Sequence, residues 1–251
     1  MLNLYVRTFK TCKKTGWLSF LLFLYAVTAQ AQEQSKARPT FLINPRFNSA
    51  GHFPFSGALI NNHLNFDVNI FFEHHHYGFF IFKSYDIKDP HSIVNYLQPG
   101  LFKKFQLGPK FQIGAFFGYV FSQTSGFADN DSDYFTAAVA YWTISDRLKL
   151  ENTALFFDLR QSAKLANRLL LSYRLKEFKF EFYVWQRVVF ENKTYATSAS
   201  VAVNLPKIKL NDALYIQNTI SYQGYLTHTK PDFALRKGLL ISIAFPITVS
   251  N

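Results

Sequence analysis

Three clusters of side chains in this sequence have the residue types for metal or hydrolytic chemistry. His74, His75 and His76 are consecutive, and imidazoles are common ligands of transition metals. The stretch from Asp129 to Asp133 reads Asp-Asn-Asp-Ser-Asp, which is how a calcium-binding loop begins. A third cluster is a histidine next to a serine at residues 91 and 92, and a hydrolase needs such a base near its nucleophile.

Each of these clusters lacks part of what its chemistry requires. Neighbouring residues of a strand point to opposite faces, so at most two of the three histidines at 74–76 converge without a turn. The calcium pattern has Tyr134 where a turn glycine is needed and Ala140 where a bidentate glutamate is needed. His91 and Ser92 lie in no local hydrolase signature, and Gly-x-Ser-x-Gly is absent. We therefore expect solvated turns and loops here, with no catalytic residue, cofactor or metal.

The N-terminus has the layout of a secretory signal. Four basic residues within 7–14 precede an apolar run over 17–27, and the small residues Ala29 and Ala31 offer a cleavage site before Gln32. Eleven helical residues reach only about half of a bilayer core, so a membrane-spanning helix is the weaker interpretation. We predict a cleaved signal peptide over 1–31 and a mature chain over 32–251.

The composition of the mature chain narrows its class. The only cysteine, Cys12, lies in the signal, so the mature chain has no disulfide and no thiol chemistry. No run of 18 apolar residues remains to form a membrane helix. The mature chain has 23 basic and 16 acidic residues, but the basic residues are scattered, which favours lipid headgroups or a lumen over nucleic acid. Its 40 aromatic residues among 220 are typical of a membrane barrel with aromatic girdles.

Apolar and polar residues alternate over lengths that can cross a membrane. Residues 64–72 place Leu, Phe, Val, Ile and Phe on one face and Asn, Asp and Asn on the other. The same alternation occurs over 110–122, 177–184, 213–224 and 238–247. Weaker segments complete the set, at 39–47, 77–86, 93–104, 133–144, 147–160, 167–176 and 195–205. The pattern predicts an all-β fold, an antiparallel up-and-down transmembrane β-barrel of about 12 strands, with 10 as the alternative.

Some details of the pattern carry further expectations. In 147–160 the apolar set changes parity after Asn152, which predicts a bulge or a later strand start. Pro99 and Pro246 are expected near strand ends or bulges, because proline has no N–H for the ladder. Alternate connections are short and are expected on the periplasmic side. A soluble β-sandwich or lipocalin-like barrel would also alternate, but with its apolar faces inward.

These features together resemble the outer-membrane β-barrel proteins of Gram-negative bacteria, in the style of the small barrels of Bacteroidetes. The resemblance covers residues 32–251 at the level of architecture. It implies a location in the cell outer membrane, contact with lipid and lipopolysaccharide, and assembly by the barrel insertion machinery. One departure is that residues 247–251 do not end in an aromatic residue, so Phe245 is the candidate for that role.

The polar faces of the strands would enclose a lumen. If the apolar faces meet lipid, the inward candidates are Asn65, Asp67, Asn69, Lys110, Gln112, Arg168, Arg174, Glu177, Lys179, Glu181, Gln217 and Gln223. Ion pairing is expected across the short turn between Arg174 or Lys176 and Lys179 or Glu181. Such a lining predicts a narrow channel or binding barrel for small polar or ionic solutes. A non-conducting structural or adhesion barrel that uses its outer loops, and a barrel-embedded lipid-modifying hydrolase, are the alternatives.

Overall fold

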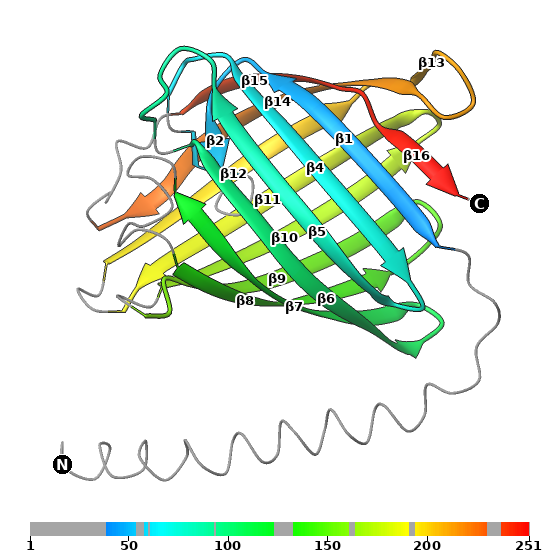
Figure 1. Cartoon of the computed structure of the whole chain (residues 1–251), viewed down its shortest axis with the longest axis horizontal. Coiled ribbons are helices and arrows are strands. Elements are labelled where there is room, and N and C mark those ends of the chain that lie inside the picture. Colours follow the sequence, from blue (N-terminus) through cyan, green and yellow to red (C-terminus); the bar gives the residue numbers. More distant parts are fainter. Residues whose placement is uncertain are drawn as a thin grey trace, which may run out of the picture. The chain divides into compact units, whose positions relative to one another are not determined.

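The computed structural model describes residues 39–53, 58–59, 61–92, 94–122, 133–160, 164–190, 194–229 and 237–250. Its strands form one closed antiparallel barrel of 12 strands, as the alternation predicted (Figure 1). Across these described residues, no helix has both the length and the apolar character needed to cross a membrane. The predicted signal peptide at 1–31 and most of the polar loop at 129–133 lie outside the described residues.

Each strand of the barrel pairs with the next one along the chain. The wall strands are β1 (Thr40–Asn48), β4 (Asn65–His74), β5 (Tyr77–Asp86), β6 (Tyr96–Gly108), β7 (Phe111–Ser122), β8 (Asp133–Thr143), β9 (Leu148–Phe157), β10 (Lys164–Leu175), β11 (Phe178–Val189), β12 (Thr194–Asn204), β14 (Tyr215–His228) and β15 (Gly238–Ala244), which continues as β16 (Ile247–Ser250). The pairing of β15 and β16 with β1 closes the barrel. Three two-residue strands lie in connections: β2 (His52–Phe53), β3 (Ala58–Leu59) and β13 (Ile208–Lys209).

The prolines interrupt the ladders at specific points. Pro246 lies in the gap between β15 and β16, as expected for a residue without an N–H. Pro99 instead lies within β6, where pairing with β7 is interrupted between Leu97 and Gly100. Pro45 lies within β1, and its carbonyl accepts a hydrogen bond of 2.9 Å from the N–H of Phe245.

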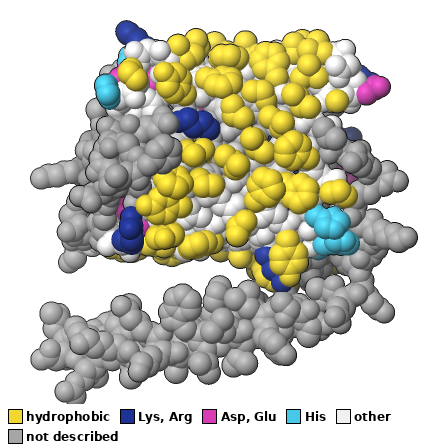
Figure 2. All heavy atoms as spheres, in the orientation of Figure 1, with side chains coloured by type: hydrophobic (Ala, Val, Ile, Leu, Met, Phe, Trp, Pro, Cys, Tyr) yellow, Lys and Arg dark blue, Asp and Glu magenta, His cyan; other side chains and the backbone are white. Residues whose placement is uncertain are grey.

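The outer surface of the barrel is apolar. Phe180 and Ile241 are 38% and 43% exposed on this surface, and hydrophobic side chains cover most of the face shown in Figure 2. This arrangement rules out the soluble alternative for the described barrel, because that alternative required the apolar faces to pack inward. Two outward polar residues satisfy each other, since Asn152 donates to Asn167 over 3.2 Å.

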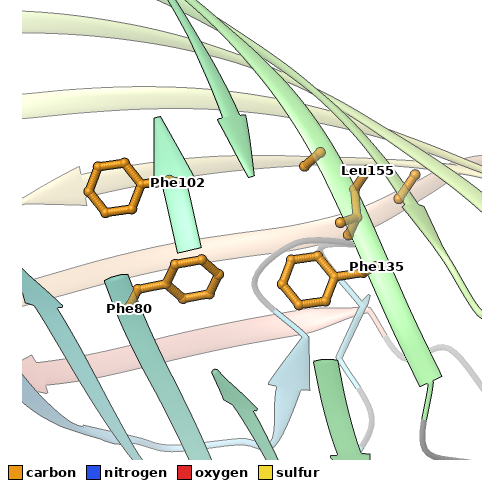
Figure 3. Packing of buried hydrophobic residues seen from close by; sticks show 6 residues of the cluster. Phe80, Phe102, Phe135 and Leu155 are labelled. Atoms are coloured by element: carbon orange, nitrogen blue, oxygen red, sulfur yellow. The ribbon is translucent and has the colours of Figure 1, made fainter. Parts of the chain in front are cut away.

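An aromatic cluster inside the barrel was not predicted from the sequence. The buried members of this internal aromatic cluster are Phe80, Phe102, Phe135, Ala137, Leu155 and Ala166 (Figure 3). Phe71, Phe116, Val120 and Phe157 pack against them. The rings of Phe102 and Phe116 are stacked with centroids 5.5 Å apart, and those of Phe80 and Phe135 are tilted at 6.1 Å. A band of apolar residues therefore crosses the inner wall from β4 to β10.

The internal aromatic cluster explains why the predicted bulge in β9 is wrong. The pairing of β9 with β8 and β10 runs without a register shift from one end of the strand to the other. Leu155 and Phe157 keep the inward parity of Glu151 and pack in the cluster, whereas Asn152 faces outward. The change of parity in the sequence marks apolar residues that turn to the interior, and the strand itself is regular.

Candidate functional site

The two ends of the barrel differ in their connections. At one end four of the five connections are short turns, such as His75 and His76 between β4 and β5, and the fifth spans residues 205–214. At the other end the connections are long, including residues 49–64 between β1 and β4 and 229–237 between β14 and β15. In barrels of this class the short turns face the periplasm. We call these the short-turn end and the long-loop end.

A cavity of about 960 Å³ lies at the short-turn end of the lumen. The ends of β8, β10 and β12 and the starts of β7, β9 and β11 surround it. Its charged lining residues are Asp146, Arg147, Lys149, Glu151, Arg174, Lys176, Glu177, Lys179 and Lys207. We call this cavity the short-turn vestibule.

The ion pairs at the vestibule differ from those expected. The strand register places Arg174 opposite Lys179, and it places Glu181 opposite Ser172. Glu181 therefore pairs with Lys179 of its own strand, with the lysine Nζ 2.5 Å from Oε1. Asn204 and Tyr183 donate to the other oxygen of this carboxylate, over 2.9 and 3.0 Å. The expected ion pair between Glu181 and Arg174 or Lys176 is wrong, because Glu181 lies opposite Ser172 and pairs with Lys179.

Most cations of the short-turn vestibule have no acidic partner. Arg168 and Glu151 form an ion pair on the inner wall, and Lys179 is paired with Glu181. Across the described residues, five lining cations have no ion pair: Arg147, Lys149, Arg174, Lys176 and Lys207. Two lining acids, Asp146 and Glu177, are likewise unpaired there. The vestibule therefore has an excess of uncompensated positive charge.

The inner wall toward the long-loop end carries a buried polar network. Asp67 accepts hydrogen bonds from Arg46 over 2.8 Å and from Asn48 over 2.7 Å. Asn48 in turn accepts a bond of 2.6 Å from Ser242, which links β15, β1 and β4. Asn48 and Asp67 are 0% and 1% exposed, so protein covers this part of the wall.

The connection between β1 and β4, residues 49–64, contributes to that cover. Leu59 and Ala50 are buried against Leu240 on the inner face of β15. Asn61 donates to the carboxylate of Asp86 over 2.6 Å, and Nδ1 of His63 lies 3.0 Å from the same oxygen.

The other oxygen of Asp86 accepts hydrogen bonds of 2.9 Å from the N–H groups of Lys88 and Asp89. This carboxylate therefore ties the first two long-loop connections together. Ala50 and Leu59 of the first connection lie against the inner wall at that end of the lumen.

The residues predicted to line the lumen fall into four groups. Asn65 and Asp67 belong to the buried network, and Asn69 lies opposite Asn44 on the same face. The vestibule includes Gln112, Arg174, Glu177, Lys179 and Gln217. Arg168, Glu181 and Gln223 lie on the inner wall outside its lining. Lys110 is in the exposed turn between β6 and β7. That these twelve residues contact a passing solute stays a prediction.

Sequence reasoning did not single out Arg147, Lys149 and Lys207 as lining residues. Arg147 and Lys207 lie just outside strands, where alternation gives no face. Lys149 alternates with Glu151, but the parity change after Asn152 concealed their shared inner face.

The described residues of the clusters at 74–76, 91–92 and 129–133 make structural contacts. His75 and His76 form a tight turn, and the rings of His74 and His75 are in edge contact at 4.0 Å. No group of three histidine, cysteine or acidic residues suited to a metal occurs in the described parts of the chain.

The serine of the His91 and Ser92 pair is engaged elsewhere. Its hydroxyl accepts a hydrogen bond of 3.2 Å from Asn61, and no hydrogen bond between the two side chains occurs within the described ranges. At the end of the calcium-like sequence, Asp133 accepts bonds of 2.8 and 3.2 Å from Arg160.

Comparisons with known proteins agree on the fold. No protein-family model and no curated protein sequence matches the chain. The NanC porin superposes with a TM-score of 0.56 at 10% identity, over 82% of this chain and 98% of the porin. The KdgM porin gives 0.53 at 10% identity, over 82% and 98% of the two chains, and an outer-membrane channel from Pseudomonas putida F1 gives 0.53 at 6%, over 88% and 98%.

The likeness to these porins identifies the architecture as an outer-membrane-type β-barrel. The KdgM porin has also been solved in complex with disordered oligogalacturonate, and that structure gives a TM-score of 0.50 at 9% identity, over 83% of this chain and 98% of the porin. The predicted location in the cell outer membrane agrees with this fold and with the apolar outer surface.

Proposed function

We propose that the protein is an outer-membrane channel for small polar or ionic solutes and that it prefers anions. The observation that carries the proposal is the excess of unpaired cations in the short-turn vestibule, with five cations and two acids unpaired there among the described residues. Charges in a cleft with low-dielectric walls act more strongly than on an open surface, because field lines are focused there. Small anions are therefore concentrated at this mouth and small cations are repelled.

The filling of the lumen favours the passage of small solutes over large ones. The internal aromatic cluster occupies part of the inner wall, and Ala50 and Leu59 lie against Leu240 toward the long-loop end. The porin-like fold supports a transport role, and the complex of the KdgM porin with oligogalacturonate is one example of such a barrel meeting an anionic solute.

Ion selectivity in planar bilayers tests the proposal. With a gradient of potassium chloride across the bilayer, we expect a reversal potential of the sign given by chloride permeation. Arg174→Glu combined with Lys149→Glu should shift it toward the cation side, because two vestibule charges change sign. Lys209→Glu is the matched control, since Lys209 lies outside the vestibule lining and pairs with Asp212 at 2.7 Å. Cation selectivity in the unmodified protein would contradict the proposal.

A non-conducting barrel is the second candidate, and one observation favours it. Asn48, Asn65, Asp67 and Asp86 on the inner wall toward the long-loop end are all 0% or 1% exposed. That amount of cover is also what a filled interior would give. A silent bilayer, with the protein folded as judged by its heat-dependent gel mobility, would favour this candidate over the channel.

A further inference from the structure

We propose that Arg147, Arg174 and Lys179 form a binding subsite for anions that carry several charged groups, approached from the short-turn end. The inference rests on the proposed function, because the anion enters the subsite through the mouth of the channel. The geometry of the vestibule indicates the class of ligand. The ligand class is a small oligomeric anion with phosphate or carboxylate groups.

The three cations lie in one row across neighbouring strands. The N–H of Arg174 donates to the carbonyl of Arg147 over 2.8 Å, so these residues are neighbours at the edge of β9 and β10. Arg174 is also directly opposite Lys179 in the pairing of β10 with β11. Adjacent strands lie about 4.8 Å apart, so the row presents positive charge over roughly 10 Å. All three residues line the same cavity.

The row is costly for the barrel itself. Like charges directly opposite each other on paired strands destabilise the pairing. Arg147 and Arg174 have no ion pair among the residues that the structure describes, and Glu181 compensates Lys179 alone. Three hydrogen-bonding side chains already share that carboxylate: Lys179, Asn204 and Tyr183. Arg147 and Arg174 therefore lack an ion-pair partner among the described residues, and a ligand can supply their counter-charge.

The size of the vestibule selects the kind of anion. A cavity of about 960 Å³ accommodates a ligand well beyond a single ion. An anion with one charged group contacts one or two of the cations. An anion whose charged groups are about 5 to 10 Å apart contacts the whole row at once. Its second and third groups bind as part of the same molecule, so they raise the affinity without a separate binding event. Guanidinium groups also bind phosphate and carboxylate oxygens in pairs.

Sided block of the ionic current tests the proposal. The probe is inorganic tripolyphosphate, added to one chamber of a planar bilayer that holds the mature chain. We expect half-block at a concentration at least tenfold lower from the short-turn side than from the long-loop side, and at least tenfold lower than for orthophosphate. A trimer of an acidic sugar, tested in parallel, shows whether phosphate or carboxylate groups bind better; either result supports the subsite.

The direction in which the barrel inserts is checked with a single introduced cysteine, because residues 32–251 contain none. The protein is added from one chamber, and insertion direction is checked on vesicles that carry the His75→Cys variant. A membrane-impermeant thiol reagent labels this variant only when the short turns face outward.

Variants separate the subsite from general charge effects. Arg174→Gln combined with Lys179→Gln should remove the tenfold preference for tripolyphosphate, whereas Lys209→Gln, outside the vestibule, should keep it. Equal block from both sides, or full block in the double variant, would overturn the proposal. If the barrel proves silent, the proposed channel fails, and titration calorimetry of tripolyphosphate with the detergent-folded barrel decides the subsite. Binding that the double variant loses supports the subsite, and no binding to the unmodified barrel overturns it.

Discussion

Two rings of the internal aromatic cluster contact wall positions that are occupied by glycine. A Cβ atom at Gly118 would lie 2.4 Å from the carbonyl oxygen of Pro99 and 2.6 Å from the ring of Phe135. At Gly100 the ring of Phe80 would be 2.4 Å away. Glycine at these positions lets the aromatic rings cover the neighbouring strand, and this contact is a known means of stabilising sheets with glycine.

Replacement of Gly118 by alanine should therefore destabilise the barrel. We expect a loss of about 1–3 kcal/mol in the free energy of unfolding, because backbone and a packed ring must both move. Gly108→Ala is the matched control, since a Cβ there meets nothing within 4 Å. Guanidinium unfolding of both variants in lipid vesicles measures the difference. Equal stability of the two variants would show that the rings do not depend on the glycine.

The turn between β4 and β5 places two non-glycine residues in a left-handed conformation. His75 and His76 have φ values of 48° and 67°, as in a type I′ turn, for which Asn-Gly is the favoured sequence. The change of both residues to Asn-Gly should stabilise the barrel by about 1–2 kcal/mol, because left-handed backbone is costly for histidine. The same unfolding measurement applies, with His74→Asn as a control at a strand position. A loss of stability would mean that the histidines make contacts worth more than the strain.

At the scale of the elements, alternation along the sequence was sufficient to place the strands. All 12 predicted segments overlap strands of the wall, and four of the five connections at one end are short, in keeping with the expected asymmetry. Strand ends were less accurate: β11 extends to Val189, well beyond the predicted end at 184. The polar residues near that end, such as Gln186 and Arg187, weaken the alternation although the hydrogen-bonded ladder continues.

The connection at 49–64 is an element whose position depends on a few polar contacts. Asn61→Ala removes its hydrogen bond to the carboxylate of Asp86. We expect this connection to open more often, because the loss of a hydrogen bond to a buried charged group costs about 2 kcal/mol, or more than tenfold in an equilibrium.

The rate at which chymotrypsin cuts within 49–64 in the folded protein measures this opening. Asp89→Ala is the control, because the half-buried Asp89 side chain accepts only from the N–H of His91 in the described structure. An unchanged rate in Asn61→Ala would show that other contacts hold the connection in place.

At the scale of the whole molecule, the apolar outer surface makes a depth-dependent prediction. Leu169 lies at the middle of β10 and is 39% exposed, whereas Leu239 lies near the long-loop end of β15 and is 55% exposed. Arginine at Leu169 should cost about 2–4 kcal/mol in a bilayer, and arginine at Leu239 about 0–1 kcal/mol, because the cost of charge falls toward the membrane surface. Unfolding in vesicles compares the two, and equal costs would contradict a bilayer around this barrel.

The candidate site was predictable in part. The sequence identified the inward polar faces, since these follow from strand parity, and Arg174 and Lys179 were among them. The excess of unpaired cations was not predictable, because it depends on which charged side chains from neighbouring strands and turns line the same cavity. Arg147 and Lys207 lie outside the strands, where alternation assigns no face. Alternation along one strand contains no information about the register of its neighbour.

The proline in β1 has a consequence for how the barrel is completed. On an antiparallel strand the N–H and carbonyl of one residue point to the same neighbour, and the carbonyl of Pro45 points to Phe245 on the final strand. The donor that proline lacks is therefore missing from the junction between the first and last strands. This junction joins the most distant parts of the sequence. We therefore expect its strands to pair last during biogenesis and to separate most readily in an incompletely folded barrel.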